Sequence, residues 1–108
     1  MAGVGTQRVF EDDRVIVWHL DLEPGEHGEQ HTHQLDCVVR VFSGSTVEVF
    51  GPDGKSLYTV ERKAGDVVGL RMDGDQLLSN ERTAVPATHS VRNVGTNRFK
   101  EVLIEFKQ

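Results

Sequence analysis

The chain has 108 residues, with 12 lysines and arginines, 17 aspartates and glutamates, and a formal net charge of -5. This length predicts one domain over residues 1–108 with a single core. The acidic balance disfavours nucleic acid or a membrane surface as a partner. No apolar run approaches the roughly 20 residues of a membrane helix, and no signal-peptide pattern opens the chain. The single cysteine, Cys37, cannot form an internal disulfide, which favours a cytoplasmic location.

Alternating apolar and polar residues dominate the sequence, and no segment keeps a helical period. The first expected strand is residues 14–22, in which alternation places four apolar side chains on one face: Ile16, Trp18, Leu20 and Leu22. The other expected strands, separated by turn signals, are residues 35–42, 46–50, 56–61, 67–70, 89–94 and 99–106, with residues 76–85 as a more polar strand pair or a long loop. Short strands at this spacing predict an antiparallel sandwich or barrel.

Three histidines form the main candidate for chemistry. His31 and His33 are two residues apart, so in an extended strand both rings project to the same face. Imidazole is a common ligand of zinc, copper, nickel and ferrous iron. A catalytic metal site usually needs three protein ligands and an open position, and His89 is the leading candidate for the third.

The spacing around these histidines resembles the first motif of the cupin superfamily. That motif is a glycine, five residues, His-x-His, three or four residues, a glutamate, six residues and a glycine. Every spacing is reproduced, with a cysteine in place of the glutamate, by Gly25, His31, His33, Cys37 and Gly44. A second, more degraded motif opens at Gly65 and ends with Pro86, His89 and Asn93.

The resemblance covers about residues 14–106 and implies the fold of a small cupin, an antiparallel double-stranded β-helix or jelly-roll barrel. It also implies a divalent metal bound by His31, His33 and His89, without the glutamate ligand. Strand alternation places Cys37 on the face of the histidines, as a fourth ligand, as a neighbour behind the ligands, or as a small buried residue. Gly25, Gly44, Gly65 and Asn93 are implied to shape turns and hydrogen bonds.

Three-histidine cupins include the iron(II) enzymes cysteine dioxygenase and acetylacetone dioxygenase. Cysteine dioxygenase also has a cysteine at the glutamate position, linked to a tyrosine, which makes Tyr58 a candidate partner of Cys37. Three neutral imidazoles leave the full charge on the metal, which favours an anionic or enolate-like substrate. We therefore expect a metal-dependent enzyme acting on a small organic molecule, with iron(II) dioxygenation as the leading reaction.

Two other functions fit the same residues. One is isomerase or lyase chemistry on a sugar or keto acid with zinc, manganese or nickel. The other is a cupin that binds a metal and a ligand without catalysis. His27 is the candidate proton shuttle, with an exposed turn residue as the alternative. His19 is expected to be structural, and alternation predicts that Leu35, Val39 and Val41 line the interior while Arg40 faces away.

Oligomeric state is a separate expectation. A small barrel exposes sheet faces and edge strands. The apolar face of Trp18, Leu20 and Leu22 is a candidate partner surface rather than core, which predicts a homodimer.

Overall fold

The computed structural model describes residues 3–107, and this part of the chain is built from strands alone. Their bounds are β1 Gln7–Glu11, β2 Val15–Leu22, β3 His31–Thr32, β4 Cys37–Ser43, β5 Ser45–Phe50, β6 Ser56–Arg62, β7 Val67–Asp73, β8 Gln76–Ser79, β9 Ala84–Pro86, β10 Thr88–Asn93 and β11 Phe99–Phe106. With no helix among these residues, no helical segment there is suited to crossing a membrane.

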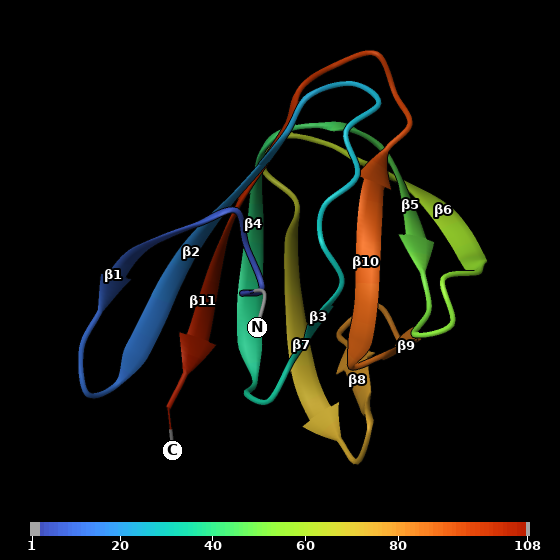
Figure 1. Cartoon of the computed structure of the whole chain (residues 1–108). Coiled ribbons are helices and arrows are strands. Elements are labelled where there is room, and N and C mark those ends of the chain that lie inside the picture. The colour runs from blue at the N-terminus through green and yellow to red at the C-terminus, as the bar shows by residue number, and fades with distance from the viewer. Residues whose placement is uncertain (1–2, 108) are drawn as a thin grey trace.

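The strands form two antiparallel sheets that face each other (Figure 1). The larger sheet has the order β1-β2-β11-β4-β7-β8-β9, and the smaller has the order β3-β10-β5-β6. Several neighbours in these sheets are distant in sequence, since β2 pairs with β11 and β10 pairs with both β3 and β5. This connectivity brings residues from both ends of the chain to the space between the sheets.

Most of the expected strands are confirmed. The polar segment 76–85 is a strand pair, β8 and β9, and the strand expected at 67–70 continues to Asp73. The alternation that placed Cys37 on the face of the histidines needs an unbroken strand from His33 to Cys37, and this condition is not met, because β3 ends at Thr32 and an irregular segment precedes β4. The sequence analysis also missed β1, an edge strand in which every residue is exposed.

The core lies between the two sheets. Its larger cluster contains side chains from both sheets and from the segment before β1: Val4, Leu20, Leu22, Cys37, Val39, Val41, Val47, Val68, Phe99 and Leu103. A smaller cluster contains Val49, Leu77 and Val85. Burying these side chains supplies the main favourable free energy of folding.

The proposal that Trp18, Leu20 and Leu22 form a partner surface is wrong. Leu20 is 6% and Leu22 is 0% exposed, and Trp18 packs against the same core cluster. The reason is that the rolled larger sheet turns this face of β2 toward the other sheet. The alternate residues, Val15 and Val17, are the ones on the outer face.

The chain turns from β4 into β5 at Gly44, where two backbones come very close. A Cβ atom at this position would lie 2.2 Å from the carbonyl oxygen of Arg62 and 2.9 Å from Cα of Lys63. Both contacts are with backbone, so no side-chain movement can relieve them. The close packing of this turn on the backbone at the end of β6 therefore explains why this position of the motif is a glycine.

We expect Gly44→Ala to lower the free energy of unfolding by about 1–3 kcal/mol through this clash. Urea unfolding measures the change. The matched control is Gly69→Ala, since Gly69 also lies in the sheet but has no atom within 4 Å of an added Cβ. Equal stability of the two variants would contradict this explanation.

Candidate metal centre

His31, His33 and His89 come together between the sheets, although residues 34–87 separate His33 from β10. The pairing of β3 with β10 produces this proximity, because His89 is the register partner of His31. A hydrogen bond from the His33 amide to the Ala87 carbonyl, 2.9 Å, continues the alignment past the end of β3. All three side chains are buried.

The three rings form a compact group. Their centroids are 4.7 to 5.0 Å apart, and one ligand nitrogen from each lies within 4.8 Å of the others. His31 Nε2 and His33 Nε2 are 3.2 Å apart. The geometry is that of three donors arranged around one point.

In the rings of His31 and His89, hydrogen bonds determine which nitrogen carries the proton and which keeps a lone pair for a metal. His31 Nδ1 lies 3.2 Å from the Glu29 carbonyl, and His89 Nδ1 lies 2.6 Å from the Pro86 carbonyl. A carbonyl oxygen can only accept, so Nδ1 carries the proton in both rings and Nε2 keeps its lone pair. Metal-binding histidines commonly have this arrangement, in which a backbone carbonyl holds the remote N–H.

The ring of His33 has one nitrogen that faces the other histidines and one that has no partner. Its Nδ1 is, among residues 3–107, the one buried side-chain polar atom without a hydrogen-bond partner. Buried polar atoms without a partner are rare and costly, and each one requires an explanation. That atom lies across the ring from the Nε2 that faces His31, so a cation bound through Nε2 would not satisfy it. The fit to a metal rests instead on the donor set, because three neutral imidazoles crowded together without a carboxylate match the ligands of a divalent cation.

Burial keeps the imidazoles neutral. It lowers the pKa of His31 to about 4 and that of His33 to about 3, with the neighbouring histidines adding to the effect. Burial also lowers the pKa of His89, partly offset by its hydrogen bond to Pro86. Since a metal binds the unprotonated ring, protons do not compete for these nitrogens near neutral pH.

We expect the ring-proton NMR signals of His31 and His33 in the metal-free protein to stay unshifted from about pH 7.5 to 5, because both remain neutral there. In the unfolded chain these rings titrate near about pH 6.5. The unfolded state then binds more protons, so their contribution to the free energy of unfolding becomes less favourable as pH falls from about 6.5 to 4. Titration of either ring near pH 6.5 would contradict their burial.

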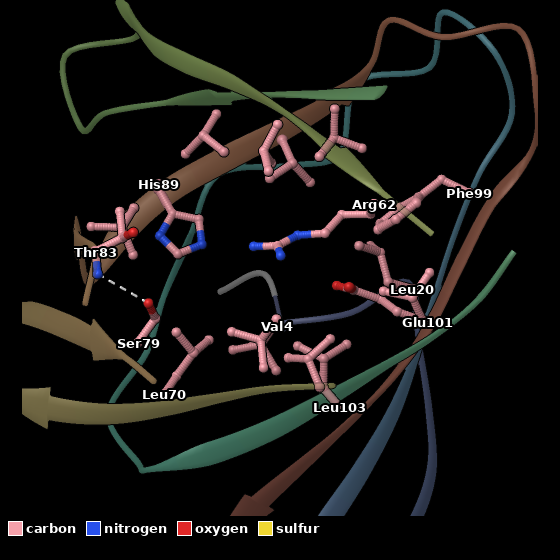
Figure 2. A pocket seen from close by; sticks show the side chains of 18 of the residues that line it. Val4, Leu20, Arg62, Leu70, Ser79, Thr83, His89, Phe99, Glu101 and Leu103 are labelled. Atoms are coloured by element: carbon pink, nitrogen blue, oxygen red, sulfur yellow. Dashed lines mark hydrogen bonds between the residues drawn. The ribbon is translucent and has the colours of Figure 1, made fainter. Parts of the chain in front are cut away.

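A cavity of about 280 Å³ opens from the histidines into the space between the sheets (Figure 2). Much of its wall is apolar, and Val39 and Val41 line it as alternation predicted. The segment before β1 also contributes, since Val4 lies at the centre of the cavity wall in Figure 2. Apolar walls exclude water and strengthen the field of any charge inside.

Three ionic side chains in the cavity wall, those of Arg62, Glu81 and Glu101, were missed by the sequence analysis. Arg62 extends from the end of β6, and Glu101 projects from β11 (Figure 2). Alternation contained a signal for both, because Arg62 shares a face of β6 with Tyr58 and Val60, and Glu101 shares a face of β11 with the buried Phe99 and Leu103.

Cys37 lies apart from the histidine group. It is buried in the larger core cluster, and the set of ligand atoms within 4.8 Å of one another contains the three histidines alone among the described residues. Burial raises the pKa of its thiol to about 12, so it is a neutral side chain there. Tyr58 packs against the smaller core cluster instead.

His27 and His19 also lie outside the group. His27 is exposed, stacks on Phe50 with ring centroids 4.7 Å apart, and shares a 2.9 Å hydrogen bond with Ser90. Ser90 follows His89 in β10, so its side chain projects to the opposite face of the strand. His19 is exposed on β2.

Comparison with protein-family models and with curated proteins gave no match. Solved structures do match. A cupin domain from Bordetella pertussis Tohama I has a TM-score of 0.70 at 23% identity, covering 100% of this chain and 99% of that one. An RmlC-like cupin with a double-stranded β-helix fold from Methanocaldococcus jannaschii has a TM-score of 0.59 at 12% identity, covering 93% of this chain and 76% of that one.

The polyketide cyclase RemF from Streptomyces resistomycificus is a further similar structure, with a TM-score of 0.55 at 14% identity. The match covers 90% of this chain and 57% of the cyclase. At these identities the comparisons establish the fold and not the activity. The chain therefore has the cupin fold, an all-β double-stranded β-helix, and carries three clustered histidines that can bind a metal ion.

Proposed function

We propose that the protein is a metal-dependent enzyme acting on a small organic molecule, with non-haem iron(II) dioxygenation as its leading reaction. The observation that carries this proposal is the convergence of three neutral imidazoles, and no carboxylate, on the wall of a mostly apolar cavity. A bound divalent cation would keep its full charge and open positions, supplying Lewis acidity and a place for substrate and dioxygen.

The chain's own residues have separate tasks in this proposal. His31, His33 and His89 hold the metal, and the carbonyls of Glu29 and Pro86 keep two of the rings in the correct tautomer. The apolar walls exclude water from the reacting centre. The cavity volume of about 280 Å³ lies at the lower end of the about 300–1,000 Å³ of ligand pockets, which suits a small substrate.

Isomerase or lyase chemistry with zinc, manganese or nickel is the second candidate, and Glu101 favours it. Burial raises the pKa of this carboxyl to about 7, opposed by the nearby Arg62 charge. A carboxyl that gains and loses a proton near neutral pH inside the cavity is suited to moving a substrate proton. A ligand-binding protein without catalysis is the third candidate.

One experiment separates the three. Metal-free protein is loaded with Fe²⁺ under nitrogen, or with Zn²⁺, and is then mixed with 2,4-pentanedione, L-cysteine or pyruvate in air-saturated buffer. We expect oxygen consumption with the iron form alone, and its loss in His89→Ala. Exchange of substrate C–H for deuterium with the zinc form and no oxygen uptake would favour the second candidate. Binding without either reaction would favour the third.

The homodimer and the cytoplasmic location remain predictions. The outer face of the larger sheet carries aligned apolar residues from three strands, since Val17 pairs with Ile104 and Ile104 pairs with Val38. Phe10, paired with Val17, is 53% exposed. This face is the surface on which we expect a second copy to pack. A sedimentation mass equal to one chain would contradict the dimer.

A further inference from the structure

Arg62 is an arginine inside the barrel rather than on its surface. Its side chain is 18% exposed, and Figure 2 shows the guanidinium reaching across the cavity toward His89. The other inward residues of β6, Tyr58 and Val60, line the same cavity. A fixed positive charge therefore lies in the same cavity as the histidine group.

The guanidinium of Arg62 has a protein hydrogen-bond partner at one of its nitrogens. Nη1 donates to both carboxylate oxygens of Glu81, each at 3.1 Å, and no other hydrogen bond of the side chain occurs among residues 3–107. A guanidinium has five N–H donors in a rigid plane. The edge formed by Nε and Nη2 has no protein partner among these residues and is open to water, since neither atom is buried without a partner. Its two parallel donors match the two oxygens of a carboxylate.

Glu101 lies beside Arg62 without pairing with it. Both line the cavity, Figure 2 places the carboxyl below the arginine side chain, and the ion pair of Arg62 is made with Glu81 instead. Burial favours the neutral form of this carboxyl and raises its pKa. In its protonated form this carboxyl does not compete for the guanidinium, and its O–H can donate to an anion.

We propose that Arg62, with Glu101 beside it, binds the carboxylate of the substrate, so that this site takes a small carboxylic acid spanning the space between Arg62 and the three histidines. The inference deepens the proposed function and rests on it for the metal end of the site. Among the described residues that line the cavity, Arg62 is the one lysine or arginine, so it is the fixed positive charge available to an anion there. A mostly apolar, low-dielectric wall also strengthens the attraction between the two charges.

The test compares butanoate with butanamide, which has the same shape and no charge. Binding of each to the zinc-loaded protein is measured by NMR titration, and zinc content is measured on the same samples. We expect butanoate to bind at least tenfold more tightly than butanamide, because hydrogen bonds to charged groups contribute about 1.5–3 kcal/mol. Equal affinity for the two probes, or no binding of butanoate, would overturn the proposal.

Variants then locate the binding group. Arg62→Gln should weaken butanoate about tenfold or more and leave butanamide and zinc content unchanged. Arg62→Lys keeps the charge but loses the edge with two parallel donors. Its affinity for butanoate should lie between those of the wild type and Arg62→Gln. The matched control is Arg98→Gln, since Arg98 also pairs with carboxylates, those of Asp21 and Glu23, but on the exposed surface.

A purely structural role for Arg62 predicts a different result. If the arginine only ties β6 to the turn between β8 and β9, then Glu81→Gln should weaken butanoate as much as Arg62→Gln does. We expect Glu81→Gln to bind butanoate at least as tightly as the wild type. Wild-type affinity in Arg62→Gln, or equal losses in the two variants, would overturn the proposal. A protein that takes up no zinc but still shows the Arg62-dependent preference would instead count against the metal site alone.

Discussion

Zinc added to the metal-free protein is expected to raise its thermal unfolding midpoint strongly, and His33→Ala is expected to abolish the increase. A ligand that binds only the folded state adds about 4 kcal/mol when its concentration is 1,000 times its dissociation constant. For a chain of this size that corresponds to about 15 °C or more. The imidazoles need no proton release to bind, because burial keeps them neutral near pH 7 by lowering each pKa.

The control for this experiment is His19→Ala, which removes an exposed imidazole outside the group. This variant should keep the full zinc-dependent increase. Differential scanning calorimetry, with and without zinc, gives the increment for each protein separately, so any baseline effect of the substitution cancels. An undiminished increment in His33→Ala would show that zinc binds elsewhere.

Asn93→Ala is expected to cause a large loss of stability, although the residue is polar. The side chain is 0% exposed and makes four hydrogen bonds. Nδ2 donates to the carbonyls of Leu22 at 3.0 Å and Asn97 at 2.7 Å, and Oδ1 accepts from Ser45 Oγ at 2.7 Å and the Gly95 amide at 3.1 Å. The amide thus links β2, β5 and the turn before β11.

Truncation would leave the buried Ser45 hydroxyl and the Leu22 carbonyl without the Asn93 amide, at about 1–3 kcal/mol for each unsatisfied group. We expect a loss of about 3 kcal/mol or more, measured by urea unfolding. Asn97→Ala is the matched control, because Asn97 is exposed and accepts through its backbone carbonyl, which the substitution keeps. A loss below about 1 kcal/mol in Asn93→Ala would contradict this account of the amide.

The histidine group was predictable because its signal is short-ranged and specific. His31 and His33 needed only a two-residue spacing, and the resemblance supplied His89 from a distant strand. The structure brings all three together. The irregular segment after Thr32 did not disturb this, because the register of β3 on β10 is set before it.

Arg62 and Glu101 were harder to predict, because a charged residue in a strand is normally assigned to solvent. The sequence analysis placed Arg40 away from the metal, and it is exposed, with its guanidinium 4.6 Å from the Phe42 ring centroid. The same alternation applied to β6 and β11 would have turned Arg62 and Glu101 inward. Alternation cannot predict that β6 and β11 face the same cavity, because this depends on strand pairings between segments distant in sequence.

β1 could not be predicted for a different reason. Both of its faces are exposed, so it has no apolar alternation, and only its pairing with β2 makes it a strand. Val4 lies just before β1 and outside any strand, yet it is buried in the cavity wall. An isolated valine between glycines has no periodic signal, so its burial depends entirely on tertiary packing.

The measurement that tests the central claim most directly is the metal content of the protein purified without an affinity tag, compared with that of His31→Ala. The account predicts about one transition-metal ion per chain in the wild type and a background level in the variant, since two imidazoles are too few for a stable site. Equal metal content in the two proteins would contradict the convergence of His31, His33 and His89 on one cation.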